Sequence, residues 1–213
     1  MADDFLTRDT IKALYLNCSL KSSSDQSNTE ALMKESMAIL GDQGIETELV
    51  RIADKKIDAV MDPKHEDEWT GEIYPMVRDA NILIIGSPIW LGEMSSLTTK
   101  VIERLYAHSA ETNDKGQYAY YGQVGAAMVT GNEDGGKHVC RNILYSLQHV
   151  GFTIPPQSDV YWVGEAGPGP SYIAAGGNDF TTNMCQTMSW NVIHFARMLK
   201  ENGGIPAKGN MSE

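Results

Sequence analysis

The chain has 213 residues, of which 42% are hydrophobic and 21% are charged, and this predicts one globular domain over residues 1–213. Its formal net charge of -11, without a basic stripe, argues against a nucleic-acid partner. No apolar run reaches the roughly 18 residues of a membrane span, and the start shows no signal peptide. We therefore expect no membrane insertion and a cytoplasmic protein.

The first half of the sequence begins with a strand and then a helix. Residues 11–16 form an apolar run, and residues 32–40 carry apolar side chains at helical spacing. Residues 46–52 alternate as in a second strand, and residues 57–76 predict a loop and a helix. The acidic stretch 65–69, "HEDEW", is expected to be a solvated face.

The second half continues the alternation. Residues 81–86, "NILIIG", are too continuously apolar for a half-exposed strand and predict one that is covered on both faces. The remaining elements are a helix at 97–106, a strand at 124–130, a helix at 139–150, a strand region at 152–162 and a helix at 188–199.

Five strands alternating with helices predict an α/β fold with a parallel sheet and helices on both faces. The expected architecture is a three-layer sandwich with strand order 2-1-3-4-5. Two stretches exceed ordinary loop length, residues 107–121 and 164–179. The first is expected far from the site. The second follows a strand, so it can reach the site as a lid or serve as a subunit contact.

Ligands of such sheets bind beyond the carboxyl ends of the strands. The loops there are "CSLKSSSDQSNT" (residues 18–29), "SPIWLGEMSS" (87–96) and "TGNEDGGKH" (130–138). In the order 2-1-3-4-5 they follow three neighbouring strands. We therefore expect them to line one crevice.

The first loop combines many hydroxyls with a helix start, which suits a phosphate dianion. The alternative is that its Ser, Asp and Asn residues only cap the helix near Asn28, or form a flexible surface loop. The second loop is apolar and aromatic and suits a flat ring, unless Trp90 is simply buried under a helix. The third is glycine-rich and permits close backbone approach, or else is a turn in which Asn132 or Asp134 caps the next helix.

Several other functions are disfavoured by missing motifs. The chain has neither GxxxxGK[ST] nor GxGxxG, which argues against an NTPase and a Rossmann dinucleotide site. No GxSxG elbow exists, and the five histidines are scattered. The cysteines Cys18, Cys140 and Cys185 lack metal-site spacing, so we expect buried thiols and no metal. The hydroxyl-rich first loop suits a phosphate, the apolar second loop suits a flat ring, and the glycine-rich third loop supplies a polar wall. FMN is a ligand with this combination of groups.

At this point the sequence resembles the flavodoxin-like NAD(P)H-dependent FMN reductases, a family that also holds the multimeric quinone-reductase flavodoxins. The likeness rests on "NCSLKSSSDQSNT", "SPIWLGEMSSLTTK" and "TGNEDGGKH". The chain departs from the family pattern at Asn17 and Cys18, where glycine is common, in extra residues of the first loop, and at Trp90 in place of tyrosine. The iron–sulfur branch needs a cysteine cluster that this chain lacks.

The resemblance implies a set of FMN-binding residues. The phosphate is held by Ser19, Lys21, Ser27, Asn28 and Thr29. The isoalloxazine ring is bordered by Pro88, Ile89, Trp90, Leu91 and Gly92. Its pyrimidine side is faced by Thr130, Gly131, Asn132, Gly135 and Gly136, where backbone donors stabilise negative charge on the reduced ring.

The resemblance also implies an activity. NAD(P)H as co-substrate gives hydride to FMN, and a quinone, flavin or similar small-molecule acceptor takes the electrons. No catalytic side chain is expected, because the flavin carries the chemistry. The alternatives are a flavodoxin-like electron carrier with little nicotinamide-dependent turnover, and a flavin-binding sensor. By analogy with the family, a homodimer or homotetramer is expected.

Overall fold

The computed structural model describes residues 10–212. Within this range the strands form a sheet in the order β2-β1-β3-β5-β6, all parallel, and a short β4 pairs antiparallel with β3. The short β4 was not predicted, so β5 and β6 are the fourth and fifth of the predicted strands. With this numbering the predicted order 2-1-3-4-5 of five parallel strands is confirmed. The strands are β1 Lys12–Asn17, β2 Glu46–Arg51, β3 Ile82–Trp90, β4 Glu93–Met94, β5 Val124–Gly131 and β6 Asp159–Val163.

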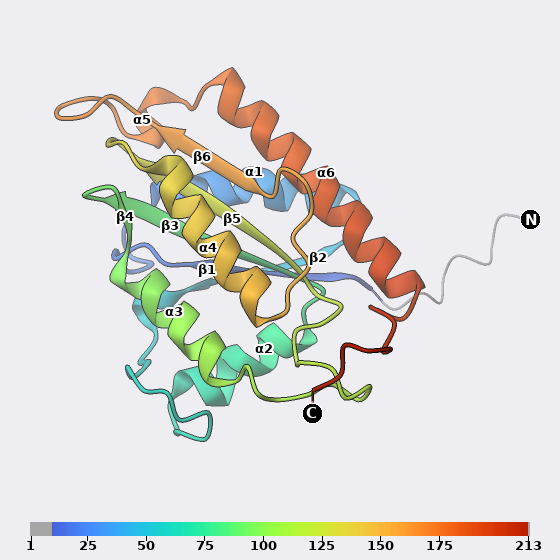
Figure 1. Cartoon of the computed structure of the whole chain (residues 1–213). Helices are drawn as coiled ribbons and strands as arrows, with labels where there is room; N and C mark the ends of the chain where they lie inside the picture. Colours follow the sequence, from blue (N-terminus) through green and yellow to red (C-terminus); the bar gives the residue numbers. More distant parts are fainter. Residues whose placement is uncertain (1–9, 213) are drawn as a thin grey trace, which may run out of the picture.

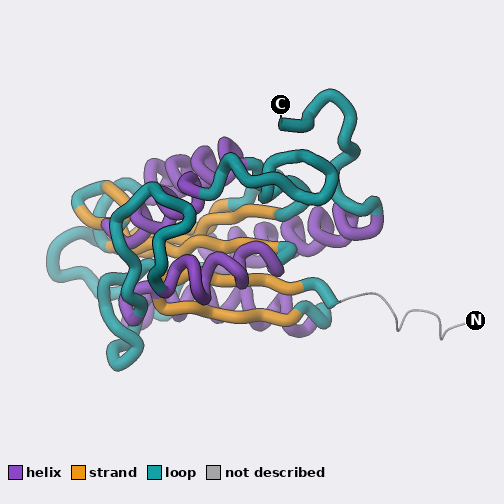
Figure 2. The backbone as a smooth tube through the Cα atoms, turned by 90° about the horizontal axis from the view of Figure 1, so that it is seen from below, coloured by secondary structure: helices purple, strands orange, loops and turns teal. Residues whose placement is uncertain are grey.

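Helices cover both faces of the sheet, as Figure 2 shows. Helices α1 and α6 pack on one face, and α2, α3 and α4 on the other (Figure 1). The α-helices are α1 Asn28–Asp42, α2 Tyr74–Asp79, α3 Ser96–Ala107, α4 Gly136–Val150, α5 Tyr172–Ala175 and α6 Asp179–Glu201. Short turns of other helix types are η1 Ile52–Asp54 and η2 Trp69–Ile73. No helix within residues 10–212 is long and apolar enough to cross a membrane.

The core lies in two apolar layers, one on each face of the sheet. In β1, Leu14 and Leu16 belong to the layer under α2, α3 and α4, whereas Ala13 and Tyr15 belong to the layer under α1 and α6. This alternation follows from the two-residue period of a strand. Because both faces are covered, the central strands are apolar throughout, as the sequence predicts. The three cysteines are buried and free, as predicted.

Two strands differ from the prediction by more than one residue at an end. Strand β3 continues through the "SPIW" residues to Trp90, because Ser87 and Pro88 still pair with β5 and Ile89 pairs with β4. Strand β6 is shorter than the predicted region 152–162. Of the residues before it, Thr153 makes only an isolated bridge to Val124.

The acidic stretch 65–69 is not simply a solvated face, and that expectation is wrong for two of its residues. Trp69 is fully buried. The carboxylate of Asp67 lies 3.3 Å from the buried Arg104 and also accepts hydrogen bonds from the backbone N–H groups of Asp58 and Thr70. A buried arginine needs such a partner, and composition alone does not reveal it.

A cluster of hydrogen-bonded, buried hydroxyls joins the end of β1 to the start of α3. Ser95 Oγ donates to Cys18 O at 2.7 Å and accepts from Thr98 N at 3.2 Å as the N-cap of α3. Ser95 N donates to Ser87 Oγ at 3.1 Å. These bonds hold the loop after β1 against the end of β3. The loop after β1 and the loop between β3 and α3 therefore keep a fixed relative position.

We expect Ser95→Ala to lower the free energy of unfolding by about 1–2 kcal/mol, because it removes a helix cap and leaves the carbonyl of Cys18 unpaired. Urea denaturation measures this. The exposed neighbour Ser96 is the matched control, and Ser96→Ala should change the stability by about 0.5 kcal/mol or less. Equal changes in the free energy of unfolding for the two substitutions would contradict the structural role of this hydroxyl cluster.

Candidate functional site

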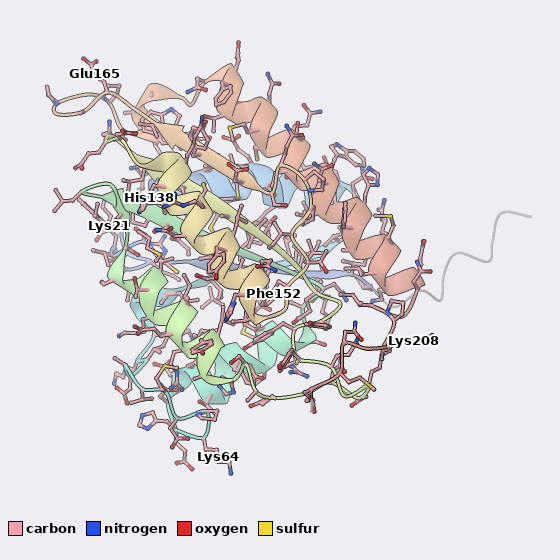
Figure 3. The ribbon with its side chains drawn as sticks, in the orientation of Figure 1. Lys21, Lys64, His138, Phe152, Glu165 and Lys208 are labelled. Atoms are coloured by element: carbon pink, nitrogen blue, oxygen red, sulfur yellow. The ribbon has the colours of Figure 1, made fainter. Side chains whose placement is uncertain are left out.

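A cavity of about 220 Å³ lies at the carboxyl ends of the strands. Residues from all three predicted loops line it, together with one residue of β6. Lys21, His138 and Glu165 lie toward this same end of the molecule in Figure 3. The lining residues are Ser19, Leu20, Lys21, Ser27, Asn28, Thr29, Pro88, Ile89, Trp90, Thr130, Gly131, Asn132, Glu133 and Trp162.

The serine loop, which we define as residues 18–27, runs from β1 into α1. Ser27 is the N-cap of α1, and its Oγ accepts a hydrogen bond from Glu30 N at 3.1 Å. Asn17 Nδ2 also donates to Ser27 Oγ, at 3.3 Å, and Asn17 Oδ1 accepts from Ser19 N at 3.0 Å. One residue thus does the capping, and the other hydroxyls of the loop are not needed for it.

A buried hydroxyl pair connects the first and third loops. Thr29 Oγ1 and Thr130 Oγ1 are 2.8 Å apart, although 101 positions separate them in the sequence. Thr29 lies in the first turn of α1, and Thr130 is near the end of β5. The pair fixes the start of α1 against the carboxyl end of β5, inside the cavity lining.

The second loop forms an apolar shelf along one side of the cavity. Ile89 is buried, whereas Trp90 is 53% exposed, so the alternative that a helix buries Trp90 is wrong. The chain then reverses at Leu91 and Gly92, whose φ angles of 51° and 79° suit a tight two-residue hairpin turn. Leu91 is 90% exposed and does not line the cavity.

Three of the glycines named from the resemblance lie outside the cavity lining. Gly135 has a φ of 120°, and a Cβ on it would lie 2.5 Å from Gly92 O. Gly92 and Gly135 therefore pack against each other and join the second loop to the third. Gly136 is buried against Tyr161 and Val163. The absence of a side chain serves packing between loops at these positions.

Asn132 lines the cavity and also binds the long segment that follows β6. Its Nδ2 lies 2.7 Å from Pro170 O, 3.2 Å from Glu165 O and 3.3 Å from Gly169 O. Neither Asn132 nor Asp134 caps α4, whose N-cap is Gly135 without a side-chain bond. Asp134 accepts instead from Gly135 N. The predicted capping alternative therefore does not hold.

The segment 164–179 contacts residues of the cavity lining but contributes none to the lining itself. Besides its bonds to Asn132, Ile173 N donates to Asn28 Oδ1 at 3.1 Å. Tyr172 packs edge-on against Trp162, with ring centroids 5.6 Å apart, and donates to Glu35 of α1. By contrast, the stretch 107–121 lies at the opposite end of the sheet, as predicted, where Gln117 Nε2 contacts Ile205 O.

The charges around the serine loop are balanced by pairing. Burial raises the pKa of Glu30, but hydrogen bonds from Lys34 and Arg51 outweigh this and lower the pKa overall. Cys18, the first residue of the loop, is fully buried, and burial raises its pKa to about 12. It is therefore a neutral thiol at physiological pH and not a nucleophile.

Eleven of the fifteen residues that the resemblance implies for FMN binding line the cavity. The four outside the lining are Leu91, Gly92, Gly135 and Gly136. Three lining residues were not foreseen: Leu20, Glu133 and Trp162. Leu20 and Glu133 lie within the predicted loops, so only Trp162 comes from a different segment. Its position next to the crevice follows from β6 pairing with β5.

The sequence family described as NADPH-dependent FMN reductase matches residues 11–166. The 8-demethyl-8-aminoriboflavin-5'-phosphate synthase of Streptomyces davaonensis is 35% identical over 204 residues, 90% of this chain and 79% of that protein. A Mycobacterium bovis protein named divalent metal cation transporter MntH is 46% identical over 202 residues, 90% of this chain. The chain spans only 29% of the length of that second relative.

Solved structures agree with the family match. RosB with the bound intermediate 8-demethyl-8-formylriboflavin-5'-phosphate has a TM-score of 0.85 and 34% identity, over 93% of this chain and 83% of that one. A flavodoxin from Archaea has a TM-score of 0.57 and 13% identity, over 88% of this chain and 99% of that one, which shows the shared fold alone. The predicted flavodoxin-like fold is confirmed, and so is FMN as the flavin of the matching family. Because the family match spans most of the sequence, the chain belongs to the family of NADPH-dependent FMN reductases.

Proposed function

We propose that the cavity binds FMN, with the phosphate at residues 19–29 and the isoalloxazine ring against residues 88–90. The chain then acts as an NAD(P)H-dependent oxidoreductase that passes electrons through FMN to a quinone, a flavin or a similar small acceptor. The observation that carries the proposal is the convergence of a hydroxyl-rich loop, an apolar aromatic shelf and a polar wall (residues 130–133) on one cavity.

The phosphate end of the proposed site uses neutral donors and the helix dipole. Ser27 Oγ already accepts two hydrogen bonds, so its own proton is available to a ligand oxygen. The start of α1 carries partial positive charge and suits an anion. Lys21 is the one cationic side chain in the lining. This donor set fits a phosphate dianion on a protein with an acidic surface.

The ring end of the proposed site is open. The cavity of about 220 Å³ is smaller than the roughly 300–1,000 Å³ of pockets that enclose drug-sized ligands. It suits the phosphate, the ribityl chain and one edge of the ring. The half-exposed Trp90 marks the open side, where a nicotinamide and then an acceptor have access to the ring.

FMN, when bound, supplies the redox chemistry between nicotinamide and acceptor. The residues of the chain bind and orient it. Thr130, Gly131 and Asn132 place neutral polar groups along the wall for the pyrimidine side, where fixed dipoles favour negative charge. The lining contains two ionisable side chains, Lys21 and Glu133, and the proposed reaction requires neither as an acid or a base.

We expect the purified protein to bind FMN and the bound flavin to bleach without oxygen when NADPH or NADH is added. Trp90→Ala should weaken FMN binding by about tenfold, because it removes an aromatic contact with the ring. Flavin fluorescence titration measures the affinity. Tyr145, an exposed aromatic residue on α4, is the matched control, and Tyr145→Ala should leave the affinity unchanged.

A protein that takes up no FMN would contradict the proposal. Uptake of FMN with negligible nicotinamide oxidation would favour the electron carrier instead.

The oligomeric state also stays a prediction, because the homodimer or homotetramer is expected only by analogy with the family.

A second candidate function is chemical modification of FMN itself. It is favoured by the 35% identity to the 8-demethyl-8-aminoriboflavin-5'-phosphate synthase, and by the likeness to RosB with a bound 8-formyl flavin phosphate. Here FMN is the substrate. With dioxygen as oxidant, its 8-methyl group would become a formyl group and one water would form, so that R–CH3 + O2 gives R–CHO + H2O.

Mass spectrometry of the flavin distinguishes the two candidates. If the chain is a reductase, FMN recovered after prolonged NAD(P)H oxidation in air keeps its mass. If FMN is the substrate, the recovered flavin gains one oxygen and loses two hydrogens. Heat-inactivated protein is the control for non-enzymatic oxidation.

A further inference from the structure

Arg51 is a buried cation behind the serine loop that no sequence motif points to. It is the last residue of β2, in register with Asn17 at the end of β1. Its side chain is 6% exposed, and it does not line the cavity. A buried arginine in an acidic protein needs partners that compensate its desolvation.

The partners of Arg51 are in the serine loop and in the first turn of α1. Its Nη1 donates to Lys21 O and to Ser22 O, both at 2.8 Å. Its Nη2 donates to the carboxylate of Glu30. The carboxylate of Asp54, three residues after Arg51, accepts a hydrogen bond from Ser23 N at 3.0 Å. Three consecutive residues of the loop are therefore held from outside the cavity.

These contacts decide which backbone groups face a ligand. A carbonyl oxygen repels a phosphate oxygen, whereas an N–H group or a hydroxyl binds it. Because Arg51 takes the carbonyl oxygens of Lys21 and Ser22, those two oxygens point to a group outside the cavity. Nη1 holds both carbonyl oxygens while Nη2 holds the carboxylate of Glu30, and the rigid planar guanidinium keeps these two sets of acceptors apart, which a single ammonium group does less well.

The contact with Glu30 has a second effect. Glu30 lies in the first turn of α1, where a negative charge competes with a bound anion for the helix dipole. Arg51 and Lys34, the latter at 2.7 Å, pair with its carboxylate. The pairing leaves the start of α1 free to attract a phosphate.

We infer that Arg51 is a positioning residue for the phosphate of the flavin, and that it creates the preference of the cavity for FMN over riboflavin. This rests on the proposed function, because it assumes that the flavin phosphate lies at the serine loop. A purely structural role would instead affect both flavins alike, since they share the same ring.

The test compares the affinities of the flavin-free protein for FMN and for riboflavin. Wild type should prefer FMN. Arg51→Met should weaken FMN binding by about tenfold or more, since hydrogen bonds that involve a charged group are lost. Riboflavin binding should change by less than about twofold on the same scale. Arg51→Lys should lie between the two. Lys12→Met, which removes a cation at the opposite end of β1, should preserve the ratio.

A double substitution guards against misfolding. Arg51→Met leaves the carboxylate of Glu30 without its buried partner, so Arg51→Met with Glu30→Gln removes the uncompensated charge as well. Because Glu30→Gln also removes the charge that competes with the phosphate for the helix dipole, the double variant should regain only part of the preference for FMN. A full return to the wild-type ratio would overturn the role of Arg51 in shaping the loop, as would an unchanged ratio in Arg51→Met. Wild-type protein that binds neither flavin would instead overturn the proposed function.

Discussion

The site depends on the register of three parallel strands. Pairing places Asn17 of β1 beside Gly86 of β3, and Pro88 beside Thr130 of β5. The segments that leave these strands therefore meet at one edge of the sheet, whatever their separation in the sequence. The buried hydroxyl pair between Thr29 and Thr130 then fixes the start of α1 to β5. A one-residue slip of β5 would turn Thr130 to the other face of the sheet and break this connection.

At the proposed phosphate site of this acidic protein, the groups that would attract an anion act locally. The start of α1 and hydroxyls of the serine loop line the cavity, and the buried guanidinium of Arg51 holds the loop from behind. The net charge of -11 arises mostly from exposed groups, whose fields water and salt screen. Neutral donors also leave the rest of the site undisturbed by strong charge, which suits a ring that must accept and release electrons.

The fold and the meeting of the three loops at one cavity could be predicted from the sequence, because both follow from local patterns. Apolar runs identified the strands, and strand order placed their loops together. Contacts between distant segments could not be predicted in this way. Asn132 looked like a ligand contact or a cap, yet its amide binds the carbonyls of the segment after β6. Arg51 belongs to a strand whose sequence shows only alternation. Gly92 and Gly135 were expected to bind FMN because of the resemblance, but their contact with each other required the structure.

The most direct test of this account is a crystal structure of the protein with FMN. The account predicts the phosphate within hydrogen-bond distance of Ser27 at the start of α1, and the ring against Pro88 and Trp90. A phosphate found elsewhere, with the serine loop free of ligand, would contradict it.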